Sequence, residues 1–213
     1  MRKLDIDVRV SKEANAGDVE EINPDAVIIA TGASLRMPDL AQDKPGVLSH
    51  VEALRHRNTI GQKVVIWGLM YGAEFAISLA EEGKDVTLIG EAGEKNLASH
   101  ASMNRRWWIL RKLADINVVR ANPEAAKVSN PRVIFNIKVK DITPQGIAIT
   151  DKQGKSSVLP FDTLIISRGR EKNDALFDQI EGLVSEVHKI GDCSAAGNIL
   201  KAIWSANEIA RKI

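Results

Sequence analysis

KVVIWGLMYGAE, at residues 63–74, is the stretch that decides the fold of this chain. Residues 64–66 (VVI) form an apolar, β-branched run, which is typical of a strand buried on both faces of a parallel sheet. Small apolar residues at helical spacing between 70 and 82 predict a helix that packs closely on this strand. Residues 84–89 (KDVTLI) predict the next parallel strand. The stretch therefore predicts the strand, turn and helix of a dinucleotide-binding fold.

The turn between strand and helix departs from the glycine fingerprint G-x-G-x-x-G of dinucleotide sites. In that fingerprint the glycines make the tight turn, let the backbone approach the pyrophosphate and let the helix pack on the strand. Gly72 keeps the third position, whereas Trp67 and Leu69 stand at the first and second. Gly68 lies between them and is a partial replacement for either. A leucine side chain where phosphate is expected to meet bare N–H groups predicts a weakened or altered site.

The acidic residue that holds a ribose hydroxyl, expected about 20 residues further on, is also displaced. The second strand ends at Gly90, and Glu91 follows one place late. Arg105 lies in the next predicted helix, within reach of a 2′-phosphate on NADP, which a glycine at position 90 would not repel. The alternative reading of Arg105 is a solvated basic helix face that includes Arg111.

The composition is that of a soluble globular protein. Of the 213 residues, 44% are hydrophobic, and no apolar run approaches the ~18 residues of a membrane-spanning helix. The single cysteine, Cys193, and an opening without a signal-peptide pattern favour a reducing, cytoplasmic setting. A net charge of +1 gives no long-range attraction for nucleic acid. The four histidines lack metal-ligand spacing and no nucleophile motif is present, so we predict neither a metal site nor a catalytic side chain.

Further elements complete an α/β prediction. Apolar runs at residues 26–30, 117–120 and 161–167 predict strands. Short alternating runs between residues 125 and 160, beginning at 132–139, predict an antiparallel β-meander. We therefore expect a Rossmann-like parallel sheet with helices on both faces and a β-meander insertion.

The two ends of the chain carry amphipathic patterns. Residues 4–10 (LDIDVRV) alternate apolar and polar, which predicts a strand. Residues 199–213 predict a terminal helix. Its inward face is expected to contain Ile199, Ala202, Ile203, Ala206, Ile209 and Ala210.

Four separated motifs point to one family. They are Ala30-Thr31-Gly32 after an apolar strand, the turn through Gly72 and Glu74, the segment SRGREKN at residues 167–173, and IGDC at residues 190–193. In this order they resemble the two-dinucleotide-binding flavoprotein family. The closest resemblance is to the C-terminal reductase half of the 2-enoate reductase, 2,4-dienoyl-CoA reductase and trimethylamine dehydrogenase group, and it covers nearly the whole chain.

The resemblance implies the domain organisation and the cofactor contacts. It implies that residues 1–38 and 183–213 form a partial FAD-binding-type domain, and that residues 39–182 form an NAD(P)-binding-type domain. Asp192 would bind the ribityl chain of FAD, and Glu74 would approach a flavin or nicotinamide; the alternative for Glu74 is an exposed helix residue. The candidate cofactor-binding residues are Thr31, Gly32, Gly68, Leu69, Met70, Gly72, Glu74, Glu91, Arg105, Gly169, Gly191, Asp192, Gly197, Asn198 and Ile199.

Two functions are consistent with these motifs. The first is the NAD(P)H/FAD-binding reductase portion or subunit of a flavin-dependent oxidoreductase. It would pass electrons from nicotinamide through FAD to a partner domain that reduces an enoate- or enoyl-CoA-like substrate. The resemblance places the first FAD-binding β-α-β unit ahead of Met1, so FAD would be shared with another segment or partner. The second is a non-catalytic domain that holds an ADP-type nucleotide or serves assembly.

Overall fold

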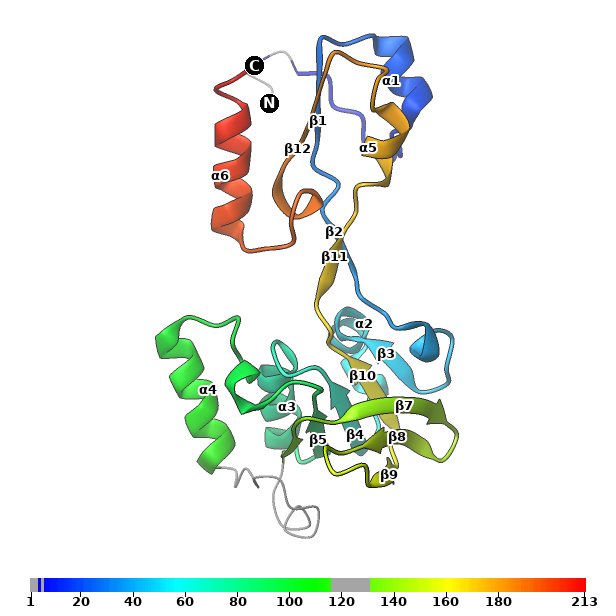
Figure 1. The fold of residues 1–213 in the computed structure, drawn as a ribbon, viewed down its shortest axis with the longest axis vertical. Helices are drawn as coiled ribbons and strands as arrows, with labels where there is room; N and C mark the ends of the chain where they lie inside the picture. Colours follow the sequence, from blue (N-terminus) through cyan, green and yellow to red (C-terminus); the bar gives the residue numbers. More distant parts are fainter. Residues whose placement is uncertain (1–3, 5, 116–130) are drawn as a thin grey trace. The chain divides into compact units, whose positions relative to one another are not determined.

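The computed structural model describes residue 4, residues 6–115 and residues 131–213, which fall into two compact units (Figure 1). Unit 1 combines the two ends of the chain, Met1–Ser34 and Arg170–Ile213. Unit 2 is the continuous stretch Leu35–Gly169. Helices accompany parallel strands in both units, so the predicted α/β class is confirmed.

Unit 2 is built on a five-stranded sheet in the order β3-β10-β4-β5-β6, with every neighbouring pair parallel. Its strands are β3 (Val47–Ser49), β4 (Lys63–Trp67), β5 (Asp85–Ile89), β6 (Arg132–Ile134) and β10 (Thr163–Ile166). Trp67 pairs in register with Ile89 on one side and with Ile166 on the other. The carboxyl ends of the three central strands are therefore level.

Alternate residues of the central strands pack against different layers. Val64 and Ile66 face the helices, in a core shared with α3 and α4. Val65 and Trp67 face the opposite way, in a core shared with the β-meander. The meander thus covers the face where a second helix layer would otherwise lie (Figure 1). The helices and 3₁₀ turns of unit 2 are η1 (Asp39–Ala41), α2 (His50–Arg55), η2 (Arg57–Thr59), α3 (Gly72–Glu81), η3 (Glu94–Asn96) and α4 (Met103–Asp115).

The predicted meander is present, as antiparallel strands β7 (Lys138–Thr143), β8 (Gly146–Thr150) and β9 (Ser156–Leu159). The assignment of residues 132–139 to it was wrong at its start, because β6 pairs in parallel with β5. Val133 is buried among the helix-facing residues, which is the environment of a sheet strand. The strand predicted at residues 117–120 lies outside the described residues.

Unit 1 contains a two-stranded parallel sheet, β1 with β12, and a small apolar core of Val19, Ile29, Ile180 and Cys193. Ile180 belongs to α5, so residues 170–182, which the sequence analysis assigned to the inserted domain, pack with unit 1. Cys193 is buried there as a free thiol. The elements of unit 1 are α1 (Ala16–Ile22), β1 (Ala26–Ile29), β2 (Ala33–Leu35), β11 (Arg170–Lys172), α5 (Ala175–Ile180), β12 (Glu186–Lys189), η5 (Gly191–Cys193) and α6 (Ile199–Ile209).

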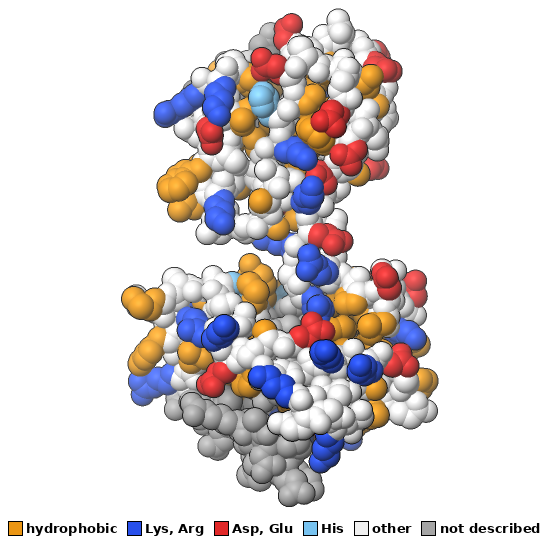
Figure 2. All heavy atoms as spheres, viewed as in Figure 1, with side chains coloured by type: hydrophobic (Ala, Val, Ile, Leu, Met, Phe, Trp, Pro, Cys, Tyr) orange, Lys and Arg blue, Asp and Glu red, His pale blue; other side chains and the backbone are white. Residues whose placement is uncertain are grey.

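Two predictions about the chain ends were wrong. Residues 6–10 form no strand, and the apolar side chains of the alternating stretch are exposed, with Val10 79% exposed. Helix α6 forms as predicted, but none of its residues is buried, and Ile199 and Ile203 are 80% and 59% exposed. Figure 2 shows apolar side chains exposed over α6. The amphipathic patterns are real, yet no described residue covers their apolar faces.

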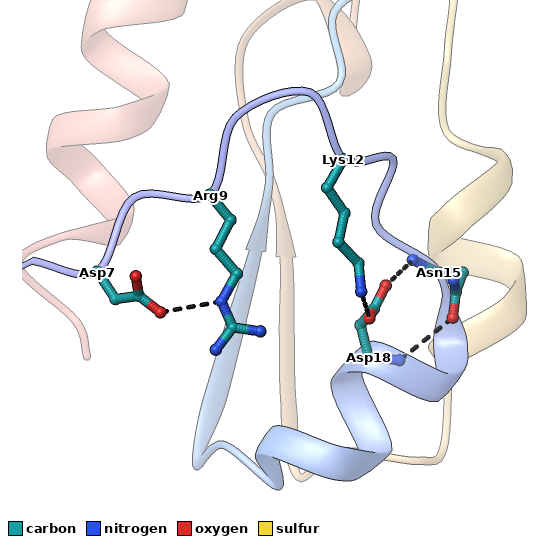
Figure 3. A network of polar contacts seen from close by, with 5 residues as sticks. All are labelled: Asp7, Arg9, Lys12, Asn15 and Asp18. Atoms are coloured by element: carbon teal, nitrogen blue, oxygen red, sulfur yellow. Dashed lines mark hydrogen bonds and ion pairs between the residues drawn. The ribbon is translucent and has the colours of Figure 1, made fainter.

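Polar contacts, by contrast, hold the N-terminal segment of unit 1 in place (Figure 3). Asn15 and Asp18 cap α1 reciprocally, each side chain accepting a hydrogen bond from the other's backbone N–H. Lys12 forms an ion pair with Asp18, and these contacts lower the pKa of the Asp18 carboxyl. Arg9 pairs with Asp7 at 2.9 Å. The segment is thus held by charges while its apolar residues remain exposed.

We expect Gly68→Ala to destabilise unit 2 more than an ordinary glycine substitution. Gly68 has φ +139°, and an added Cβ would lie 2.0 Å from the carbonyl oxygen of Ser167. Gly154→Ala is the matched control, because φ is +82° there and nothing lies within 4 Å. The control should lose about 1–2 kcal/mol from backbone strain alone, and Gly68→Ala about 3 kcal/mol or more once steric overlap is added.

Denaturant unfolding followed by tryptophan fluorescence measures both losses, since Trp67 is buried in this unit. Equal losses for the two variants would show that the close contact at Gly68 is not a constraint.

Candidate functional site

The turns that follow β4, β5 and β10 meet at one edge of the unit 2 sheet. They enclose a hollow of about 190 Å³. Its lining residues are Trp67, Gly68, Leu69, Met70, Gly90, Glu91, Ala92, Asn96, Ser167 and Arg168. Ligands of open α/β sheets bind outside the carboxyl ends of the strands, which is where this hollow lies. A hollow of about 290 Å³ lies near the starts of β4 and β5, away from this edge.

Gly68 provides the close backbone approach at this edge. Its N–H donates to the carbonyl of Ile89 at 3.0 Å, and its missing side chain leaves room for the backbone of Ser167. The glycine therefore lets the turns after β4 and β10 touch each other. The structure thus gives Gly68 a role in the contact between two turns.

Leu69 does not project into the turn. It is only 6% exposed and belongs to the helix-facing core. Its side chain lies over Gly90, where an added Cβ would be 2.2 Å from Leu69 Cγ. The side chain of Leu69 therefore does not block the turn, as its place in the sequence suggested. It crowds the end of β5 instead. A side chain at position 90 would require the buried Leu69 side chain to move.

The turn presents free backbone donors. Among the described residues, no hydrogen-bond acceptor faces the N–H groups of Leu69, Met70, Tyr71 and Gly72. The N-terminus of α3 also has no side-chain cap. Consecutive unpaired N–H groups at a helix N-terminus bind phosphate. The residues at this turn therefore fit the diphosphate of an adenine nucleotide.

Arg168 lies beside these donors, and sequence reasoning did not single it out. Its guanidinium is 4.4 Å from the centre of the Trp67 ring, and Nη1 donates to Glu91 at 2.8 Å. The position immediately after a predicted strand end was the available signal. The structure thus joins Glu91, a predicted site residue, to an arginine across the hollow.

A second charged group forms at the first turn of α3. Glu74 accepts from Arg105 Nε at 2.6 Å and lies 3.6 Å from Nε2 of His100. The ring of His100 packs against Tyr71 with centroids 4.1 Å apart. Burial lowers the pKa of His100, and Glu74 partly opposes this shift. The two predicted residues Glu74 and Arg105 therefore neutralise each other, while Arg105 does not line the hollow.

His50 approaches the site from α2. Its Nδ1 lies 3.0 Å from Oγ of Ser167, which is buried, and its ring packs against Phe75. Burial lowers the pKa of His50, with a smaller opposing effect of Glu74. The imidazole is therefore neutral at physiological pH and serves as a hydrogen-bonding group.

In unit 1 the predicted FAD contacts bond to one another. Asp192 Oδ2 accepts from Arg170 at 2.5 Å, and Oδ1 accepts from the N–H of Gly197 at 2.9 Å. Arg170 also donates to the carbonyl of Gly197 at 3.0 Å. Gly191 has φ +64° and donates to Ser205 Oγ at 2.9 Å. Asp192 thus fixes the loop that precedes α6.

The turns where the chain enters and leaves unit 1 are also joined. The hydroxyl of Thr31 donates a hydrogen bond to the carbonyl of Asn173. The backbone N–H of Asn173 in turn donates to the carbonyl of Gly32 at 3.1 Å. Gly169 has φ +87° in an open position. Asn198 caps α6 by accepting from the N–H of Lys201 at 3.0 Å. The hydrogen bonds of Thr31, Asn173 and Asn198 thus hold the two turns and the start of α6 in place.

The fit of FAD to unit 1 is partial. Asp192 is 19% exposed, so a ligand hydroxyl can reach its carboxylate. Within the described residues of unit 1, however, β1 leads into β2, and β12 reaches α6 only through the 3₁₀ turn η5, so neither strand runs directly into a helix as in a pyrophosphate-binding β-α-β unit. The chain offers one wall of an FAD site. The described ranges contain no cluster of metal-binding side chains and no helix with the length and apolar composition that a membrane crossing needs.

Known proteins resemble this chain along most of its length. A family model described as "Pyridine nucleotide-disulphide oxidoreductase" matches residues 3–191. Cinnamate reductase of Clostridium sporogenes is 25% identical over 100% of this chain and 30% of the relative. Bilirubin reductase of Mediterraneibacter gnavus is 30% identical over 95% of this chain and 30% of the relative. The solved 2-naphthoyl-CoA reductase complex matches at TM-score 0.78 and 24% identity, over 100% of this chain and 30% of that one. This chain spans about 30% of the length of these relatives.

The stability of the chain should fall in mild acid. The pKa of His50 is lowered in the folded state, so its contribution is complete above the unfolded pKa of about 6.5 and is lost as pH falls through the folded value. His50→Asn keeps a hydrogen-bonding atom near Ser167 and cannot titrate. Unfolding free energies between about pH 8 and about pH 5 should therefore decline less in the variant. Parallel pH profiles would contradict a buried neutral His50.

Proposed function

The chain belongs to the pyridine nucleotide-disulphide oxidoreductase family, and on this premise we propose that it is the nucleotide-binding reductase portion of a larger flavin-dependent oxidoreductase. Membership implies binding of FAD and NAD(P)H, the cofactors expected from the sequence. The resemblance to the enoate reductase group is also confirmed, since cinnamate reductase and 2-naphthoyl-CoA reductase are among the relatives. Enoate- or enoyl-CoA-like compounds are the proposed substrates of the whole enzyme.

The observation that carries this proposal is the turn after β4. In the described part of the chain the N–H groups of residues 69–72, just before and at the start of α3, have no acceptor at this carboxyl edge, and the side chain of Leu69 packs in the helix-facing core. This arrangement supports diphosphate binding despite the altered fingerprint. Unit 2 is therefore the proposed nicotinamide-nucleotide domain, and unit 1 the proposed FAD-side domain.

The residues of the chain bind and orient, whereas the redox chemistry, a hydride transfer between nicotinamide and flavin, is that of the cofactors when bound. The N–H groups of residues 69–72 would hold the diphosphate, and Arg168 would balance its charge. Ser167 and neutral His50 would fix the backbone beside the turn. In unit 1, Asp192 would accept hydrogen bonds from hydroxyls of FAD, with Arg170 holding its carboxylate in place.

A partner must complete unit 1 under this proposal. The exposed apolar side chains of residues 4–10 and of α6 have no cover among the described residues. Two strands alone make a marginal sheet, and the outer edges of β1 and β12 are open to pairing. A β-α-β unit, in the same polypeptide or another, would extend this sheet and bring the missing pyrophosphate cradle. A substrate-reducing domain would then receive the electrons.

A second candidate is a non-catalytic domain that holds an ADP-type nucleotide. The packing of Leu69 over Gly90 favours it, since the usual ribose contact is absent. Diphosphate binding alone would satisfy this function. The two candidates differ in whether nicotinamide nucleotides bind.

Nucleotide binding can be followed through Trp67, which lines the hollow. The other three tryptophans are 47–67% exposed, so Phe replacements of Trp107, Trp108 and Trp204 should be tolerated and leave one reporter. We expect NADH and NADPH to change its fluorescence saturably. A response to ADP alone would support the second candidate, and no response to any of the three would contradict both.

FAD should not be retained by the 213-residue chain alone, because unit 1 offers only one wall of its site. After incubation with FAD and gel filtration, the protein should elute without visible flavin absorbance. Stoichiometric flavin in the protein peak would show that the described residues suffice to bind FAD, and the need for a partner would be refuted.

A further inference from the structure

The end of β5 lacks the feature by which dinucleotide folds distinguish ribose from ribose 2′-phosphate. An acidic side chain at that position accepts hydrogen bonds from the 2′-hydroxyl and repels a 2′-phosphate. Here the position is Gly90. Its φ is not in the left-handed region, so the backbone itself would accept a side chain.

The Leu69 side chain occupies the space that a side chain at this position would need. A Cβ at Gly90 would lie 2.2, 2.5 and 2.7 Å from Cγ, Cδ1 and Cδ2 of Leu69. All three atoms are beyond the Cβ of Leu69, so truncation to alanine removes every one of these contacts. Leu69 and Gly90 thus complement each other: a large side chain after β4 fills the space left by the missing side chain after β5.

The charged groups nearby do not restore selectivity. Glu91, one residue on, is bound to Arg168 at 2.8 Å, so a carboxylate and a guanidinium cancel each other at this end of the hollow. Arg105, predicted to be a 2′-phosphate ligand, is bound to Glu74 at 2.6 Å. Among the residues that line the hollow in the described part of the chain, the acid and the arginine, Glu91 and Arg168, are thus bound to each other.

The phosphate end is different. The unpaired N–H groups of residues 69–72 remain available. Trp67 lines the same hollow, is 3% exposed, and has an indole N–H without a partner among the described residues. The indole N–H is buried on the meander-facing side, so the backbone N–H groups of the turn are the donors placed to meet a diphosphate.

We propose that this crevice selects nucleotides by their diphosphate and does not discriminate at the ribose 2′ position, with Leu69 as the specificity-determining residue. The inference rests on the proposed function of the crevice. NADH and NADPH should then bind the chain with dissociation constants within about threefold of each other. A nucleotide without the nicotinamide, such as ADP, should compete with both.

The test restores an acid at the strand end. Leu69→Ala combined with Gly90→Glu makes room for a carboxylate, and Leu69→Ala combined with Gly90→Gln is the control that differs only in charge. Binding of NADH and NADPH is measured by fluorescence for the full chain and both variants. We expect the Glu variant to favour NADH by about tenfold or more and the Gln variant to show no such preference.

Three results would overturn the inference. A preference above about threefold in the unmodified chain would refute it and leave nucleotide binding intact. Equal behaviour of the Glu and Gln variants would show that a carboxylate at position 90 does not set the selectivity, so that its exclusion by Leu69 has no effect on nucleotide choice. Absence of binding by any nucleotide to the unmodified chain would refute the proposed function together with the inference. Thermal melting of both variants verifies that they fold, and the ratio in the unmodified chain is decisive even if they do not.

Discussion

The structure of unit 2 depends on the close contact between the turns after β4 and β10. Gly68 donates to the carbonyl of Ile89 at 3.0 Å, and Ser167 donates to that of Trp67 at 2.8 Å. These bonds fasten the ends of three adjacent strands together, and they require that position 68 carry no side chain. The crevice at the strand ends exists because the backbones are fixed in this way.

The residues that break the glycine fingerprint are core residues. Leu69 packs with the helix-facing core and Trp67 with the meander-facing core, so the two large side chains leave the turn in different directions. The meander accounts for Trp67, since a face covered by strands offers room for an indole. The departures from the fingerprint therefore reflect how this sheet is covered, and the backbone donors of the turn are retained.

The sequence was most informative where periodicity and burial coincide. The β-branched run of β4 and the small residues of α3 are buried on the predicted sides, because both elements lie within unit 2. It was misleading at α6 and residues 4–10, where the pattern predicts burial but the covering surface is absent from the described chain. It was silent on Arg168 and on the Leu69–Gly90 contact, since side-chain pairs between turns distant in sequence leave no periodic signal.

The two candidate cofactor regions share one electrostatic feature, the pairing of acidic side chains with arginines. Each acid that the sequence marked as a cofactor contact is paired with an arginine: Glu91 with Arg168, Glu74 with Arg105 and Asp192 with Arg170. Partly exposed pairs of this kind contribute only about 0–1 kcal/mol to stability, so their main effect here is to cancel charge around the hollow and around Asp192. Each pair also holds its carboxylate in one orientation. Under the proposed function, the backbone N–H groups of the turn after β4, which have no acceptor among the described residues, determine where the diphosphate of a nucleotide binds.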